Sequence, residues 1–181
     1  MRRGAAATLL AAAALGLLAA PAGAEQTTTQ RFFAAHLLED DGTSREVRDL
    51  LRSGRGFVDR RVTFRDLTGD DKRDAVVRVQ SGGAAGVVAL YVLSTDTGRR
   101  RSSGLQVVFR SQELLQAETR IRDGVLRYRS SRPQPGEEVC CPSRVAETRL
   151  RWREGRHRFT VAERRDIGVD EPWGDQAPPA S

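Results

Sequence analysis

The sequence predicts an α+β fold in which two short N-terminal helices pack on a mainly antiparallel sheet of about six or seven strands. Before Gly54, apolar residues recur at helical spacing. From Val62 onward the apolar period is two, and turn signals follow at regular intervals. Two hairpins near the C-terminus each sort into one apolar face and one arginine-rich face, which is typical of a sheet covered on one side.

The first helix is predicted within residues 25–42, EQTTTQRFFAAHLLEDDG. The hydroxyl residues 27–29 are candidate N-caps, and Phe33 and Leu37 share one side at helical spacing. Gly42 is expected to end this helix.

The second helix is predicted to begin at a capping box, because Thr43 and Glu46 have the required spacing of hydroxyl and carboxylate. It is expected to stop near Gly54. Both helices are about three turns or less, too short to be stable alone, so their apolar stripes must dock on the sheet.

Strands are predicted from the alternating segments that follow, at residues 60–66, 74–80, 87–94 and 105–112. The third of these, VVALYVLS, is apolar on both faces. Such a run indicates a central strand that is covered on both sides.

The first hairpin closes at Asp123-Gly124, a strong signal for a two-residue turn. Closure there sets Ile121 beside Leu126 on the apolar face. The opposite face then carries Glu118, Arg120, Arg122, Arg127 and Arg129.

The second hairpin is predicted to close at Glu154-Gly155, which pairs Trp152 with His157 on the apolar face. The opposite face collects Arg149, Arg151, Arg153, Arg156 and Arg158. A slip of one residue would bury these arginines, so the two-sided pattern supports the register.

Residues 1–24 have the pattern of a cleavable signal peptide, with Arg2 and Arg3, an apolar run and the small residues 22–24. A retained anchor is the alternative, but the run is shorter than the roughly 20 residues of a membrane span. The chain is therefore expected to be secreted or to lie on the exterior of the cell envelope, with no membrane span after cleavage.

Cleavage leaves 157 of the 181 residues, enough for one domain, which we place at residues 25–168. The Pro-rich tail, residues 169–181, lacks periodicity and is predicted to be disordered. Without the signal peptide the chain has 28 basic and 24 acidic residues, and Lys72 is its only lysine. A net charge of +4 permits the binding of polyanions without specifying it.

One loop has the spacing of a calcium site. Calcium loops place oxygen ligands at alternate positions, with a backbone carbonyl at position 7. The candidate ligands at positions 1, 3, 5, 7 and 9 are Asp66, Thr68, Asp70, the Lys72 carbonyl and Asp74.

Over about a dozen residues, this loop resembles the acidic loop of FG-GAP/VCBS-type repeats of extracellular proteins. The resemblance implies calcium binding ahead of an apolar strand, here residues 75–77. Thr68 is a neutral ligand, and Asp71 stands where glycine is usual because the turn needs a positive φ. The alternative is a polar turn in which the carboxylates cap their own backbone, with Lys72 or Arg73 as the counter-charge.

Cys140 and Cys141 are the only cysteines. An even pair in an exported protein favours a disulfide, although adjacent Cα atoms lie about 3.8 Å apart and would strain it. We predict a structural vicinal disulfide, and two bonds to partner chains or two free thiols are the alternatives. The motif CCPS with the following arginine-rich hairpin is similar to the C-terminal pattern of uncharacterised exported actinobacterial proteins, which implies no activity.

The arginines of the second hairpin are candidate anion-binding residues. Like charges that face each other across a hairpin are mildly destabilising, which raises the question of what neutralises Arg151 and Arg158. An anionic ligand, glutamates on neighbouring strands, or salt could do so. Single-stranded nucleic acid is the least favoured ligand because interleaved aromatic residues are scarce.

The sequence holds no nucleophile elbow, zincin motif or phosphate loop. We therefore expect an exported non-enzymatic binding or interaction module, with calcium as its one cofactor and an anionic envelope polymer or another protein as its partner. The alternative is a small secreted metal-dependent hydrolase that uses the carboxylates of residues 66–74.

Overall fold

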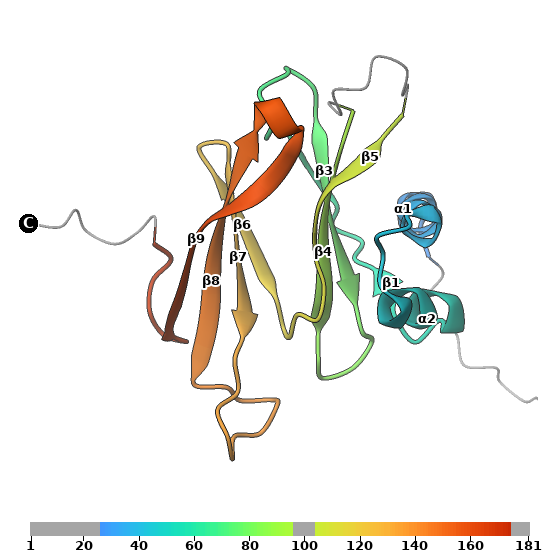
Figure 1. Cartoon of the computed structure of the whole chain (residues 1–181). Coiled ribbons are helices and arrows are strands. Elements are labelled where there is room, and N and C mark those ends of the chain that lie inside the picture. Colours follow the sequence, from blue (N-terminus) through green and yellow to red (C-terminus); the bar gives the residue numbers. More distant parts are fainter. Residues whose placement is uncertain (1–25, 96–103, 175–181) are drawn as a thin grey trace, which may run out of the picture.

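The computed structural model describes residues 26–95 and 104–174 and shows three layers (Figure 1). Two helices form the first layer, a five-stranded sheet the second and a four-stranded sheet the third. The predicted signal peptide lies outside the described residues. Within them, no helix is long and apolar enough to cross a membrane.

The helices are α1 (Thr28–Glu39) and α2 (Arg45–Ser53). Thr27 caps α1 in a reciprocal capping box with Gln30, whose side chain also donates a 2.7 Å hydrogen bond to the Val58 carbonyl. The predicted box at Thr43 is wrong: Ser44 is the N-cap of α2. The hydroxyl of Thr43 donates instead to Asp40 in the preceding turn, so it is not available to the helix.

The five-stranded sheet is antiparallel. It contains β1 (Phe57–Val58), β2 (Thr63–Arg65), β3 (Asp74–Gln80), β4 (Val87–Ser94) and β5 (Gln106–Ser111), in the order β1-β3-β4-β5 with β2 also beside β3. As predicted, β4 is covered on both sides. Tyr91 faces a core shared with the helices, and Val92 faces a core shared with the other sheet.

The four-stranded sheet is also antiparallel, with its strands in chain order. They are β6 (Glu118–Arg122), β7 (Val125–Ser131), β8 (Arg144–Arg153) and β9 (Arg158–Gly168), and a 3-10 turn, η1 (Glu154–Arg156), joins the last two.

The prediction of one sheet of six or seven strands is wrong, because nine strands form two sheets among the described residues. Residues 112–117 carry the chain from one sheet to the other, and the amides of Leu114 and Ala117 bond to carbonyls of β4 on the way. Alternation of apolar residues shows which side of a strand is buried, but it does not show which strands share a sheet.

The first hairpin has the predicted register: Ile121 pairs with Leu126, and both turn residues have positive φ. The second does not, because Trp152 pairs with Phe159 and Arg153 with Arg158. Its loop has four residues, and it ends at His157, whose φ is 44°. Gly155 is not among the residues with positive φ, so the turn cannot be the two-residue type that needs positive φ at both positions.

Residues 169–174 follow β9 and lie against the outer face of the four-stranded sheet (Figure 1). This differs from the disorder predicted for the tail. The remainder of the predicted tail, residues 175–181, lies outside the described residues.

Candidate functional site

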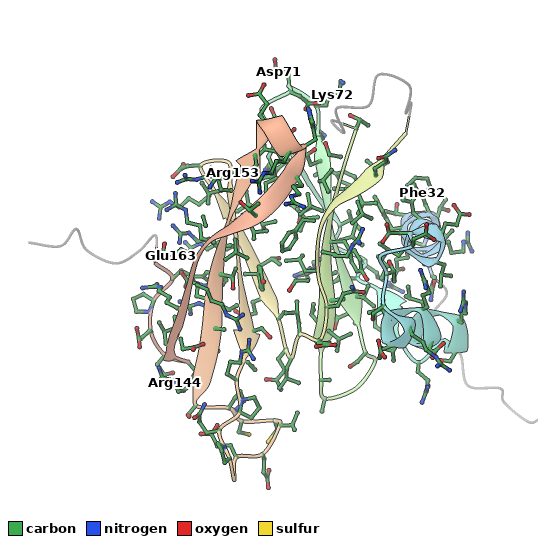
Figure 2. The ribbon with its side chains drawn as sticks, viewed as in Figure 1. Phe32, Asp71, Lys72, Arg144, Arg153 and Glu163 are labelled. Carbon is green, nitrogen blue, oxygen red and sulfur yellow. The ribbon has the colours of Figure 1, made fainter. Side chains whose placement is uncertain are left out.

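The four-stranded sheet and its last turn carry the arginines that the sequence singled out, and Figure 2 labels one of them, Arg153. Cross-strand pairing arranges them in rows that run across the strands. One row is Glu118, Arg129, Glu147 and Arg165, and the next is Arg120, Arg127, Arg149 and Glu163. These two rows each contain at least one carboxylate, whereas the pair of Arg153 and Arg158 nearer the turn contains none.

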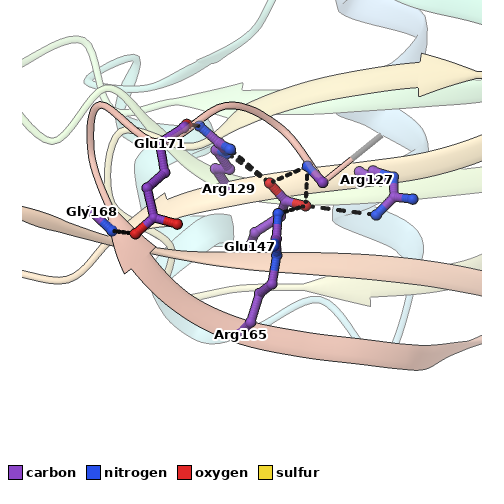
Figure 3. Close-up of polar contacts among 7 residues, drawn as sticks. Arg127, Arg129, Glu147, Arg165, Gly168 and Glu171 are labelled. Carbon is purple, nitrogen blue, oxygen red and sulfur yellow. Dashed lines mark hydrogen bonds and ion pairs between the residues drawn. The ribbon is translucent and has the colours of Figure 1, made fainter. Parts of the chain in front are cut away.

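Glu147 is the centre of a charged cluster (Figure 3). Its side chain is 2% exposed, and Arg129 donates two hydrogen bonds to it, of 2.8 and 2.9 Å. Arg165 lies 3.2 Å and Arg127 3.6 Å from its other oxygen. Three guanidinium groups thus share one buried carboxylate, so each of them has an acidic partner within the molecule, while the cluster as a whole stays positive.

The C-terminal segment, residues 169–174, covers the cluster. The Gly174 amide donates to Glu147 at 3.0 Å, and Arg129 donates to the Glu171 carbonyl at 2.9 Å. The Arg129 guanidinium also lies 4.4 Å from the centre of the Trp173 ring, in cation–π contact.

Burial by itself raises the pKa of Glu147. Hydrogen bonds from Arg129 and Gly174 and the charge of Arg165 outweigh burial and hold the pKa below its ordinary value of 4.5. Glu147 is therefore a stable carboxylate at neutral pH and is not suited to exchange a proton there.

The other end of the same face is different. We call its four arginines the basic tip: Arg151, Arg153, Arg156 and Arg158. All four are exposed, and within residues 26–95 and 104–174 they form no ion pair, even with Glu154 of the same turn. The fifth candidate, Arg149, lies instead in a row between Arg127 and Glu163.

The predicted calcium loop connects β2 to β3. Asp66 accepts hydrogen bonds from the amides of Gly69 and Asp71, at 2.7 and 3.1 Å. Asp70 accepts from the Thr68 hydroxyl and from the Lys72 amide. The carboxylates thus cap their own backbone, as the alternative from the sequence describes.

Two features of the loop still match the calcium pattern. Asp71 has a φ of 63°, the conformation that position 6 of such a loop needs. The second oxygen of Asp70 accepts no hydrogen bond from the described residues and lies 3.7 Å from the Lys72 ammonium.

Asp74 points inward and is 1% exposed. It accepts hydrogen bonds from the amides of Leu67, at 2.7 Å, and Thr68, at 3.1 Å. Burial raises the pKa of Asp74 above 3.8, against the opposing hydrogen bonds from Ser94 and Leu67. In the described chain no group of three or more acidic, histidine or cysteine side chains converges in a way that could hold a metal.

Cys140 and Cys141 lie on an exposed loop, with their Sγ atoms 2.6 Å apart. The Cys141 amide donates to the Glu138 carbonyl, which holds the two residues in a turn. The vicinal disulfide stays a prediction.

The sequence did not identify the Glu147 cluster or the role of Trp173. Glu147 lies on β8, two residues before Arg149, the first residue named in the predicted second hairpin. The one available signal was a large aromatic residue, Trp173, within a polar and Pro-rich segment.

No protein-family model matches the chain, and no curated protein or solved structure is significantly similar to it.

Proposed function

We propose that this protein is an exported, non-enzymatic binding module that holds an anionic chain at the basic tip. The observation that carries the proposal is that the arginines of the four-stranded sheet differ in whether they have a carboxylate partner. Arg127, Arg129 and Arg165 share Glu147, whereas the arginines of the basic tip are exposed without a carboxylate partner among the described residues.

An anionic ligand would relieve a local repulsion. Arg153 lies directly opposite Arg158, and like charges in that position destabilise a strand pair. The guanidinium fork can donate two parallel hydrogen bonds to one carboxylate or phosphate group. A chain that carries such groups in series could therefore engage several arginines of the tip at once.

The hydrolase alternative has less support. It needs the carboxylates of residues 66–74 turned toward a common centre, but Asp66 and Asp74 accept hydrogen bonds from amides of their own loop. Grooves of about 730, 640 and 500 Å³ on the described surface lie beside β5, at the basic tip and between residues 132–134 and β9, and residues outside the loop line all three.

Export is part of the proposal and rests on the pattern of residues 1–24. Mass spectrometry of the protein from the culture medium or cell envelope should find Glu25 as its first residue. A protein that keeps Met1 would contradict cleavage.

Binding should depend on the basic tip rather than on total charge. We expect a variant with glutamate at all four tip positions to bind polyphosphate and polyglutamate about tenfold or more weakly, because each lost contact is charge-assisted. The measurement is fluorescence anisotropy at about 50 and 300 mM salt, since screening should weaken the wild-type interaction.

The matched control carries the same change of charge elsewhere. Four exposed arginines outside the four-stranded sheet, Arg52, Arg55, Arg60 and Arg65, become glutamate in it. This control should keep most of the affinity. Equal losses in the two variants would mean that net charge alone drives binding, and the proposal would fail.

A further inference from the structure

A groove runs along the seam between the two sheets, where β5 and β9 lie beside each other (Figure 1). Its volume is about 730 Å³, within the usual range of binding pockets. Residues 106–110 line one side and residues 156–161 the other. Two arginines of the basic tip, Arg156 and Arg158, belong to the second side.

The floor of the groove is apolar because the core between the sheets reaches the surface there. Phe159 and Val108, which line it, are 6% and 8% exposed and belong to that core. Val161 also lines the groove, but it is much more exposed than these two residues. It pairs with Leu150, which is 2% exposed, yet Val161 is 53% exposed. One half of a core-facing pair is therefore left uncovered at this point of the seam.

Both walls of the groove are edge strands. In the described part of the chain β5 pairs with β4 alone, and β9 pairs with β8 alone. An edge strand presents a row of backbone amides and carbonyls without a ladder partner, which is the usual template for an added strand.

The charge along the groove is positive. Arg156 and Arg158 are exposed and form no ion pair with the described residues, whereas Arg110 on the opposite wall is held by Asp40 at 3.1 Å. An occupant needs carboxylates to complement the guanidinium groups, apolar side chains to cover Val161, and a backbone that can pair with an edge strand.

We propose that the groove binds an extended acidic polypeptide segment of a partner protein, which adds a strand along the seam. This inference rests on the proposed function for Arg156 and Arg158, and it names the class of ligand. A polyphosphate or an anionic polysaccharide would satisfy the arginines, but it has neither apolar side chains for Val161 nor peptide groups for the strand edge.

The test compares two labelled peptides of equal charge by fluorescence anisotropy at about 100 mM salt. One consists of four Glu-Val repeats. The other consists of four Glu-Pro repeats, in which proline removes amide donors and opposes strand pairing. We expect the Glu-Val peptide to bind about tenfold more tightly than the Glu-Pro peptide.

Val161→Asp should remove this difference, because it places a charge on the apolar floor. Its matched control is Val139→Asp, at a valine that is 50% exposed on the cysteine loop, and this change should leave binding unaltered. Val161 is exposed, so its substitution should leave the melting temperature nearly unchanged, and a melting curve verifies that both variants fold.

One outcome is that the protein binds the two peptides with equal affinity and that the four-glutamate variant binds neither. This outcome would overturn the proposal for the groove, and the proposed function would remain. If the affinity for the Glu-Val peptide does not depend on the tip arginines, both the groove proposal and the proposed function are overturned.

A chain shortened to residue 174 should bind the Glu-Val peptide as tightly as the full chain. Tighter binding would show that residues 175–181 occupy the groove, which would overturn a partner as its occupant.

Discussion

At the scale of single residues, Glu147 distinguishes the arginines of the outer face that have an acidic partner from those that have none. The sequence shows an arginine-rich face with an open question of neutralisation. The structure answers the question for Arg127 and Arg129, because both pair with Glu147; Arg165, which the sequence did not single out, pairs with it as well. The basic tip lies beyond its reach, and its arginines form no ion pair in the described chain.

Glu147→Gln should lower the free energy of unfolding at pH 7 by about 2–4 kcal/mol, because it leaves buried guanidinium charge without its partner. The pKa of Glu147 lies below 4.5 in the folded chain, so its contribution is present above pH 4.5 and is lost as the pH falls through the folded pKa. The difference in the free energy of unfolding between wild type and variant should therefore shrink as the pH is lowered.

Urea unfolding from pH 7 to pH 3 measures this gap. The control is Glu163→Gln, at an exposed glutamate on the same face, which should have little effect at any pH. A gap that stays constant across the acidic range would show that the Glu147 charge does not stabilise the fold.

At the scale of elements, the β2–β3 loop has the spacing and the backbone turn of a calcium loop, while its carboxylates already bond to their own amides. These hydrogen bonds do not exhaust the carboxylates, since two oxygens offer about four acceptor sites. Calcium binding at the loop therefore stays a prediction.

The prediction is that about 5 mM calcium stabilises residues 25–181 relative to EDTA. A site with a dissociation constant near 10⁻³ M would add about 1 kcal/mol and raise the melting temperature by about 2–4 °C. Asp70→Asn should abolish the rise, whereas Asp71→Asn, which changes the same charge outside the ligand set, should preserve it. Melting curves that superimpose with calcium and with EDTA would contradict calcium binding and would support the alternative, a turn whose carboxylates cap their own backbone.

The β8–β9 connection shows a second limit at this scale. A two-residue turn and a four-residue turn both place Arg151 and Arg153 on the outer face, so the alternating pattern does not distinguish them. With the two-residue turn Arg158 would pair with Arg151, whereas with the observed four-residue turn it pairs with Arg153. Loop conformation, here a 3-10 turn closed by His157, fixes the register.

At the scale of the whole molecule, residues 169–174 act as a cover that joins the end of the chain to its outer sheet. Removal of residues 169–181 should cost about 2 kcal/mol, because it removes the cation–π contact of Trp173 and the hydrogen bonds to Glu147 and Arg129. Removal of residues 175–181 alone should have little effect. Urea unfolding of the two shortened chains gives the comparison, and equal stabilities would show that the cover contributes nothing.

The sequence by itself determined most of the elements. Helical spacing placed both helices, Gly54 marked the end of α2, and the continuous apolar run of residues 87–94 placed the central strand β4 with its two buried faces. The sequence also placed β6 and β7 in register, because the Asp123-Gly124 pair permits only a tight turn. These features depend on neighbours in sequence, whose periodicity and backbone preferences are local.

Only the tertiary structure decided how the strands divide into two sheets, which arginines pair with Glu147, and where the core opens at Val161. Each of these joins residues that are far apart along the chain. The alternation of apolar and polar residues fixes which way a side chain points, and it carries no information about what lies opposite.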